Sequence, residues 1–448
     1  MNHSLDKMQS YDTYKPSNID WIGEIPSHWK VMGFTKSINL VIDYRGKTPT
    51  KTDEGIFLVT AKNIKKGKID YDLSKEYISE DDYESVMCRG AVSMGDVLFT
   101  TEAPLGEVAN IDKTDIALAQ RIVKFRGKES LLNNYYLKYS ILSQYFIDQV
   151  QQEATGSTVL GIKASKFSML YQILPSLQEQ QTIVIYLDQK ITLIDELIEK
   201  KQSKIELLKE QRTSLINHAV TKGLNTEVAF KDSKIEWIGD IPEHWKVKKL
   251  KFVGDFQNGI SKGAEYFGEG YPFMNYGDVY KNEVTPSEVE GKVQSDEKER
   301  EQYSILRGDV FFTRTSESKD DIGISSTCLS SISNCVFSGF VIRFRFFQKT
   351  HIPEYSKYHF QTHWKKVFIE SQMNIVTRSS LSQQVLGQVP VLIPPLSEQQ
   401  AIGAYLDEQT ALIDKKIELE SQKITTLKEY RQSLISAVVT GKICVIDN

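Results

Sequence analysis

Two stretches of the chain share one pattern of apolar and polar positions. Residues 175–221 and 394–440 each begin at a proline and then place apolar side chains three and four residues apart. Apart from Gly403, neither stretch contains a glycine, and no proline follows Pro395 within them. The spacing therefore predicts one long helix in each stretch.

The apolar positions of both stretches repeat about every 3.5 residues, the period of helices that supercoil around each other. The seam positions are Leu187, Ile194, Lys201, Ile205 and Leu208 in the first helix, and Leu406, Ile413, Glu420, Ile424 and Leu427 in the second. Lys201 and Glu420 occupy equivalent positions with opposite charges. We expect them either to pair and set the register or to extend to water.

The connector between the two repeats fixes the direction of this pair. A helix of this length spans about 70 Å, whereas the connector, residues 222–236, reaches at most about 50 Å. A parallel pair would require the chain to return along the whole helix. We therefore predict an antiparallel coiled coil.

A globular segment precedes each helix, and both segments open with the same motif. Residues 21–31 read WIGEIPSHWKV and residues 237–247 read WIGDIPEHWKV. We expect the tryptophans of both motifs, residues 21, 29, 237 and 245, to anchor each globular head to a helix end. Further on, GDVLFT at 95–100 matches GDVFFT at 308–313, which predicts a turn and a strand in each head. Helices are expected at 133–149 and 353–369.

The predicted fold is α+β: two globular heads joined by two long helices that form an antiparallel coiled coil, with a pseudo-twofold internal repeat. The expected boundaries are head one at 1–174, the first long helix at 175–221, the connector at 222–236, head two at 237–393, the second long helix at 394–440 and a tail at 441–448. Residues 15–23 resemble 231–239. We therefore expect the N-terminus near the end of the second helix.

Composition changes this interpretation little. The chain has 448 residues, of which 40% are hydrophobic and 25% charged, as in ordinary soluble proteins. We find no transmembrane run and no signal peptide, and expect a cytoplasmic protein with reduced, scattered cysteines. The net charge of -4 is unusual for a nucleic-acid binder unless a basic face is local.

Motifs for catalysis are missing. The sequence contains no GxxxxGK[ST] phosphate loop and no Asn-Pro-Pro-Tyr or Asp-Pro-Pro-Tyr stretch. His359 with His363, and Asp278 with Glu290 and Lys292, are weak candidates for a metal site and a nuclease site. The two histidines are better explained as partly exposed polar positions, and the Asp278 group as a chance pattern in a charged chain. We therefore predict no catalytic residue and no metal ligand.

The heads share a frame but differ in their polar loops. Basic residues in these loops stand among Tyr, Phe, Trp, Thr and Asn, a mixture that suits phosphate contacts and base-edge readout. Two modules that read two short targets would show this pattern. Drift after duplication would show it as well.

The two openings, the GDV.FT strands and the helix bodies LID…LK[EQ].R.SLI resemble the specificity (S) subunit of type I restriction-modification systems. The resemblance covers almost the whole chain. It implies two target-recognition domains that each read half of a gapped double-stranded DNA site. It also implies that this chain binds no cofactor, and that methyltransferase subunits, two of them, and ATP-dependent restriction subunits supply S-adenosylmethionine, ATP and Mg.

The resemblance places DNA-contacting loops near residues 45–50, 62–68, 100–102 and 155–163 of head one, and near 258–262, 275–278, 313–315 and 377–380 of head two. The candidate contacts are Arg45, Lys47, Lys62, Asn63, Lys65, Thr101, Ser157, Lys163, Lys262, Asn275, Tyr276, Arg314, Thr377 and Arg378. A methylation-only complex, and a coiled-coil scaffold with protein-binding heads, remain as alternatives.

Overall fold

The computed structural model describes residues 9–19, 21–44, 49–316, 321–347, 350–371 and 379–446. The chain divides into two compact units: residues 1–202 with 422–448, and residues 203–421. Each unit contains one head and a part of both long helices. The two units are described separately below.

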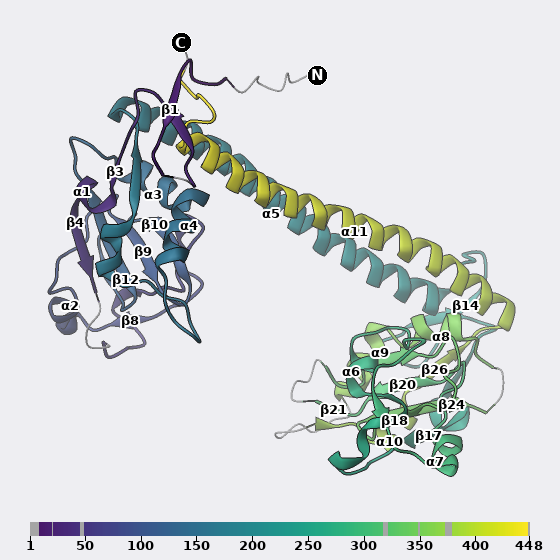
Figure 1. Cartoon of the computed structure of the whole chain (residues 1–448). Helices are drawn as coiled ribbons and strands as arrows, with labels where there is room; N and C mark the ends of the chain where they lie inside the picture. The colour runs from purple at the N-terminus through teal and green to yellow at the C-terminus, as the bar shows by residue number, and fades with distance from the viewer. Residues whose placement is uncertain are drawn as a thin grey trace. The chain divides into compact units, whose positions relative to one another are not determined.

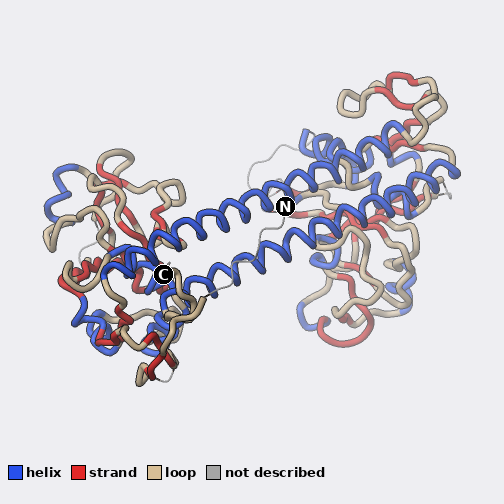
Figure 2. Tube along the Cα trace, turned by 90° about the horizontal axis from the view of Figure 1, so that it is seen from above, coloured by secondary structure: helices blue, strands red, loops and turns tan. Residues whose placement is uncertain are grey.

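The long helices are α5, Leu177–Lys222, and α11, Leu396–Val439, each continuous along its length (Figure 2). Each begins within two residues of the prolines that end the preceding strand. At the start of α5, the Ser176 hydroxyl accepts from the Glu179 N–H (3.2 Å), and the Glu179 carboxylate accepts from the Ser176 N–H (3.0 Å). This reciprocal cap satisfies two free backbone donors.

The two helices run antiparallel, as predicted. Side chains of α5 pair with side chains of α11 that lie progressively earlier in the chain. The pairs are Asp195–Arg431 in the first unit, and Lys204–Glu420 and Arg212–Asp414 in the second.

Head one is built on a four-stranded antiparallel sheet in the order β10-β9-β12-β4, with α3 packed on it (Figure 1). A smaller sheet, β11-β5-β8, contains the parallel pair β11 and β5. The elements are α1 Phe34–Ser37, β4 Ile38–Asp43, β5 Ile56–Val59, β6 Ile64–Lys65, β7 Lys68–Ile69, β8 Tyr77–Ile78, α2 Glu80–Val86, β9 Val97–Thr101, β10 Leu105–Asn110, β11 Ile116–Leu118, β12 Ile122–Gly127, α3 Asn134–Leu142, α4 Gln144–Glu153 and the 3-10 helix η1 Ala164–Met169.

Head two repeats this frame. Its main sheet has the order β17-β24-β20-β22, and its smaller sheet, β19-β18-β23, again contains one parallel pair, β18 and β23. The elements are η2 Leu250–Phe252, β17 Gly254–Asn258, η3 Ala264–Tyr266, β18 Phe267–Met274, α6 Tyr276–Tyr280, β19 Lys292–Val293, α7 Glu297–Gln302, β20 Val310–Thr313, β21 Thr315–Ser316, β22 Ser325–Thr327, β23 Val336–Phe337, β24 Val341–Phe346, α8 Pro353–His359, α9 His363–Ser371, β25 Ser379–Ser380 and α10 Gln383–Gln388.

The shared opening motif forms two small ladders in each unit. β1 (Tyr14–Pro16) pairs with β2 (Glu24–Pro26), and β3 (Lys30–Gly33) pairs with β13 (Tyr171–Leu174). Their counterparts are β14 (Phe230–Asp232) with β15 (Asp240–Pro242), and β16 (Lys246–Lys249) with β26 (Pro390–Ile393). Thus the segment expected to be only a connector contributes a strand.

The first described residues of the chain, from Gln9 on, lie against the end of α11, as the repeat predicts. The Cys444 N–H donates to the Gln9 carbonyl oxygen at 2.7 Å, and the Tyr14 hydroxyl donates to the Gly441 carbonyl oxygen at 2.9 Å.

The expectation of single helices at 133–149 and 353–369 is wrong. Each region forms two helices, α3 with α4 and α8 with α9. At the first break, Ser143 has an extended backbone with ψ 153°, and its hydroxyl donates to the Ser140 carbonyl oxygen at 2.5 Å. A serine that bonds its local backbone competes with helix continuation.

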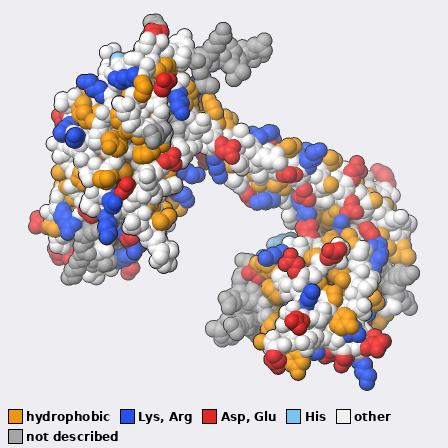
Figure 3. Space-filling view, viewed as in Figure 1, with side chains coloured by type: hydrophobic (Ala, Val, Ile, Leu, Met, Phe, Trp, Pro, Cys, Tyr) orange, Lys and Arg blue, Asp and Glu red, His pale blue; other side chains and the backbone are white. Residues whose placement is uncertain are grey.

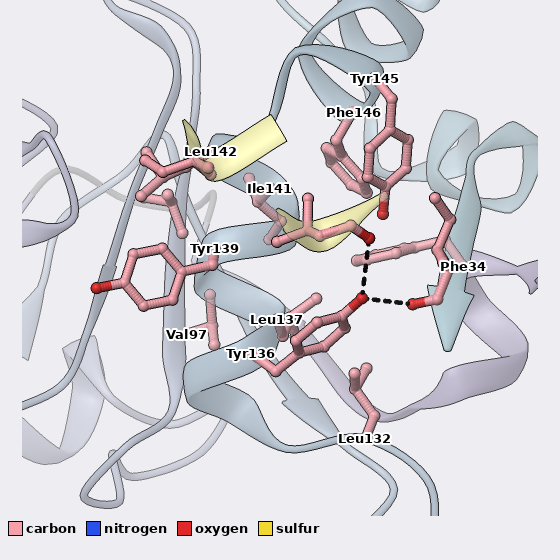
Figure 4. Close-up of a cluster of buried hydrophobic side chains, with 14 of the residues drawn as sticks. Phe34, Val97, Leu132, Tyr136, Leu137, Tyr139, Ile141, Leu142, Tyr145 and Phe146 are labelled. Carbon is pink, nitrogen blue, oxygen red and sulfur yellow. Dashed lines mark hydrogen bonds between the residues drawn. The ribbon is translucent and has the colours of Figure 1, made fainter. Parts of the chain in front are cut away.

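The core of head one includes both long helices. Phe34, Tyr136 and Phe146 pack with Leu187 of α5 and Val438 of α11. The Tyr136 hydroxyl lies 3.2 Å from the Ile173 carbonyl oxygen and 3.4 Å from that of Val439 (Figure 4). The helices are therefore part of the core of the head.

Candidate nucleic-acid interface

Each head is fastened to a helix start by one tryptophan. Trp29 is fully buried and its indole N–H donates to Glu179 at 3.0 Å; Trp245 is likewise buried and donates to Glu398 at 2.9 Å. Trp21 and Trp237 are 46% and 41% exposed, and the Trp237 ring lies edge-to-face on Phe368 of α9 with centroids 6.0 Å apart. Neither tryptophan is buried as Trp29 and Trp245 are, and their role as anchors stays a prediction.

Loops of head two converge at one end of the main sheet, where β20 ends. β21 pairs with β25 and sets Thr315 opposite Ser380. The Arg314 backbone N–H donates to the Phe340 carbonyl oxygen at 3.0 Å, and the Gln383 amide donates to Asn258 at 3.1 Å. We call residues 258–262, 313–316, 338–340 and 379–383 loop cluster two. It joins three of the four loops predicted for this head.

Head one assembles a corresponding but different group, loop cluster one, from residues 101–103, 120–121 and 154–163. A backbone bridge joins Glu102 to Gly161, and Arg121 Nε lies 2.8 Å from Glu102 Oε1. Ser157 and Lys163 are exposed there. Two of the predicted loops of head one therefore lie together.

Several predicted contacts prove to be structural residues. Asn63 is fully buried, and its amide group bonds the backbone of its own loop at Thr60, Asp70 and Ser74. Thr101 is fully buried, with its hydroxyl donating to the Arg121 carbonyl oxygen at 3.2 Å. Both assignments as DNA contacts are wrong, because neither side chain reaches the surface.

Two of the candidate DNA contacts in head two, Lys262 and Asn275, form hydrogen bonds with residues of the same head. Lys262 donates to Glu299 at 2.7 Å and to the Gln294 carbonyl oxygen at 2.7 Å. Asn275 caps α6, where its side chain accepts from the Asp278 N–H and the Asp278 carboxylate accepts from the Asn275 N–H. This reciprocal cap also accounts for Asp278, which therefore needs no nuclease role.

Other candidates remain on the surface. Lys62 and Lys65 are exposed in the loop around the β6–β7 hairpin, although this loop packs beside α11 and outside loop cluster one. Tyr276 is half-buried and stacks on Tyr280 with ring centroids 5.8 Å apart. Arg314 is half-buried within loop cluster two. Four candidates lie outside the described residues: Arg45, Lys47, Thr377 and Arg378.

Buried ion pairs explain part of the basic residue content of the heads. Arg126 binds Asp96 through two bonds of 2.6 and 2.8 Å, and Arg345 binds Asp309 through two of 2.6 and 2.7 Å. These aspartates belong to the two GDV motifs. Burial pushes the pKa of the Asp96 carboxyl upward, but the bonds from Arg126 and the charge of Lys124 outweigh it and hold the pKa below its usual value.

The seam positions of both long helices face inward. The buried members are Leu187, Ile194, Ile205, Leu208, Leu406, Ile413, Glu420 and Ile424, and the half-buried ones are Lys201 and Leu427. Glu420 accepts from Lys204 at 3.0 Å. Lys204, one helical turn after Lys201, thus supplies a cation to Glu420, and the predicted pairing of Lys201 with Glu420 stays a prediction.

The surface charge is mixed. On the face shown in Figure 3, Lys and Arg side chains are interspersed with Asp and Glu. Within the described ranges, no cluster of three or more His, Cys, Asp or Glu residues could hold a metal ion. In the same part of the chain, we find no helix with the length and apolar character needed to cross a membrane.

Sequence reasoning missed the exposed apolar side chains of the loop clusters. Phe340 is 62% exposed in loop cluster two, and Val159 and Leu160 are 51% and 55% exposed in loop cluster one. Each follows or precedes a glycine by at most three residues. The glycines beside these apolar residues were the signal in the sequence that could have predicted exposed apolar side chains in the loops.

Comparison with known proteins adds an independent result. A family model described as the type I restriction modification DNA specificity domain matches residues 58–207 and 242–429, one range in each repeat. The putative type I restriction enzyme MjaX specificity subunit of Methanocaldococcus jannaschii is 25% identical over 441 residues, covering 95% of this chain and 96% of that protein. The type I restriction enzyme EcoKI specificity subunit of Escherichia coli K12 is 22% identical over 446 residues, covering 94% and 90%.

Two solved structures share the fold. One, described as the structural basis of complex assembly and conformational transition of the type I R-M system, has a chain that matches with a TM-score of 0.72 at 17% identity, covering 94% of this chain and 99% of that chain. The HsdS subunit from Thermoanaerobacter tengcongensis matches with a TM-score of 0.52 at 17% identity, covering 94% and 98%. Since the family model accounts for both repeats and the relatives span the chain from end to end, the protein belongs to the DNA specificity subunits of type I restriction-modification systems.

Proposed function

We propose that each head reads one half of a two-part, gapped DNA sequence through its loop cluster. The observation that carries this proposal is the convergence of dissimilar loops on a repeated frame. Loop cluster two combines Arg314 and Phe340, whereas loop cluster one combines Arg121, Glu102 and the exposed tip at 157–160. A guanidinium suits guanine edges or phosphates and an exposed ring suits stacking or wedging. Two different clusters would read two different half-sites.

The long helices would set the number of unread base pairs and dock methyltransferase subunits. Two copies of one partner require surfaces that occur twice. Exposed apolar residues recur at equivalent positions of both repeats: Trp21 and Trp237, Leu177 and Leu396, and Leu193 and Leu412. Such repeated patches support docking of two identical subunits.

The chemistry would then reside in the partners. Methyltransferase subunits would bring S-adenosylmethionine, and restriction subunits would bring ATP and Mg, in the cytoplasm where the host DNA lies. A complex without restriction subunits would use this chain in the same way.

The first test maps adenine methylation in the host genome with and without this chain. We expect the chain to be required for methylation of one gapped, two-part motif. An unchanged map in an expressed system would refute the proposal.

A second test assigns the half-sites. Arg314→Ala should weaken binding by about 1–3 kcal/mol and relax one half-site only. Arg307→Ala is the matched control, because Arg307 precedes the opposite end of β20 and pairs with Glu354 at 2.7 Å. Unchanged affinity and unchanged target in both Arg314→Ala and Phe340→Ala would remove loop cluster two from DNA recognition.

A further inference from the structure

Two equivalent arginines each join three elements. Arg212 of α5 forms an ion pair with Asp414 of α11, with Nε 3.1 Å from the carboxylate but without hydrogen-bond geometry, and its Nη2 donates to Glu283 of head two at 2.8 Å. One side chain of α5 therefore links this helix to the opposite helix and to a head loop within the second unit.

The same arrangement recurs in the first unit with the helices exchanged. Arg431 of α11 donates through Nε to Asp195 of α5 at 3.0 Å and through Nη2 to the Lys66 carbonyl oxygen of head one at 3.0 Å. Arg212 and Arg431 occupy the same position of the repeated helix, as do Asp195 and Asp414. The arginine of each copy thus meets the aspartate of the other copy.

The head side of each contact is itself held in place. Lys66 lies at the tip of the β6–β7 hairpin, and its N–H donates to Glu107 of β10 at 2.8 Å. In head two, the Glu283 carbonyl oxygen accepts from the Thr327 N–H of β22 at 3.0 Å. Each arginine therefore contacts a loop that is tied to the main sheet of its head.

The arginine side of each contact is shielded from water, whereas the carboxylates are more exposed: 53% for Glu283, 52% for Asp414 and 31% for Asp195. The arginine side chains are only 20% exposed for Arg212 and 11% for Arg431. A planar guanidinium holds several acceptors in a fixed geometry. By contrast, apolar seam residues that repeat every heptad tolerate a slip of the helices more readily, whereas specific polar contacts between helices favour one register.

To recognise one gap length, the protein must fix both the distance and the rotation between the two half-sites. Adding one base pair to the gap moves the second half-site by about 3.4 Å and turns it by about 35° around the duplex, since one turn takes 10–10.5 base pairs. Helix register can fix the translation. The attachment of each head to the helix pair fixes how that head is rotated about the pair.

We propose that Arg212 and Arg431 are positioning residues that couple the helix register to the pose of each head, and so restrict recognition to one gap length. This inference rests on the proposed function. It adds the residues that keep the number of base pairs between the two half-sites constant.

The test measures binding of the assembled complex to duplexes that carry both half-sites at the natural gap or at one base pair more or fewer. The variant is Arg212→Met with Arg431→Met. The control is Lys209→Met with Lys428→Met, which removes the same charge from exposed positions of the same helices. We expect the preference for the natural gap to fall about tenfold in the variant, equal to about 1.4 kcal/mol, and to stay at the wild-type level in the control.

A companion exchange, Asp195→Arg with Arg431→Asp, rebuilds the contact between the helices but not the one from α11 to head one. We expect it to bind with a widened gap preference. An unchanged gap preference in either variant would overturn the inference, even at reduced affinity. A methionine variant that cannot assemble would also count against it, because the arginines would then act in folding. A wild-type complex without any gapped target would instead refute the proposed function.

Discussion

Lys365 gives a quantitative test of head two. This lysine lies in α9 with 5% exposure, and its ammonium donates to the Gly323 carbonyl oxygen (3.1 Å) and the Ser325 hydroxyl (3.0 Å). Among the described residues it forms no ion pair with a carboxylate. Burial alone lowers the pKa of this amine from 10.5 to about 7.

The sign of the effect follows from proton binding. Between pH 7 and 10.5 the unfolded chain keeps this proton while the folded chain releases it, so the free energy of unfolding rises with pH in this window. Below about pH 7 the buried ammonium is charged and its cost is fully present. At about 1.4 kcal/mol for each pKa unit, that cost is about 5 kcal/mol.

The variant is Lys365→Met, in which a side chain of similar length replaces the lysine and carries no titratable amine. Losing the bonds to Gly323 and Ser325 costs about 1–3 kcal/mol at every pH. The stability of the variant relative to wild type should fall by about 2–3 kcal/mol between pH 7.5 and 9.5. Urea denaturation followed by tryptophan fluorescence measures this difference.

Lys366→Met is the control, since Lys366 is more exposed and lies 3.8 Å from Glu370. Its pH dependence should match that of wild type. If wild type and Lys365→Met gave parallel curves of stability against pH, the lysine would be solvated in solution and the reasoning would be wrong.

Two further predictions concern the frame of the heads. Asp309→Asn leaves the Arg345 guanidinium without its anion and should destabilise head two by about 3–5 kcal/mol, measured by urea denaturation; a loss below 1 kcal/mol would contradict the buried pair. Trp245→Phe removes the bond to Glu398, a charged acceptor, and should cost about 1.5–3 kcal/mol. Trp29→Phe should cost a similar amount if the two anchors are equivalent, and calorimetric melting of both variants checks this.

Much of the architecture could be predicted from the sequence because it rests on periodicity. The heptad pattern and the length of the connector were enough for two long antiparallel helices. The breaks at Ser143 and Thr362, whose hydroxyls donate to the Ser140 and His359 carbonyl oxygens, could not be predicted. A polar residue bonded to its local backbone looks the same in sequence as one that faces water. Lys365 is a similar case: its counterpart in α4 is the core residue Phe146, and no apolar pattern reveals a buried lysine.

The choice of site residues failed for a related reason. Asn63 and Asn275 have the hydrogen-bonding groups that suit a base edge, but the same groups suit the turns in which they lie, whose free N–H groups need acceptors. The type of a residue therefore does not show whether its side chain contacts DNA or holds its own loop in place.

Comparison of the two repeats helps to distinguish DNA contacts from residues that build the frame, which a sequence without a repeat does not allow. Two heads that read different half-sites have no reason to share a DNA contact, whereas they must share whatever builds the frame. Asp309 and Arg345 have counterparts in head one, Asp96 and Arg126, and in each pair the aspartate is buried and the arginine half-buried. Arg314 and Phe340 align with Thr101 and Arg121 in head one and differ from them in side chain; Arg314 is half-buried where Thr101 is buried, and Phe340 and Arg121 are both exposed. Polar or aromatic residues that are exposed in a loop cluster and unmatched between the repeats are therefore the ones that mutagenesis of specificity should address first.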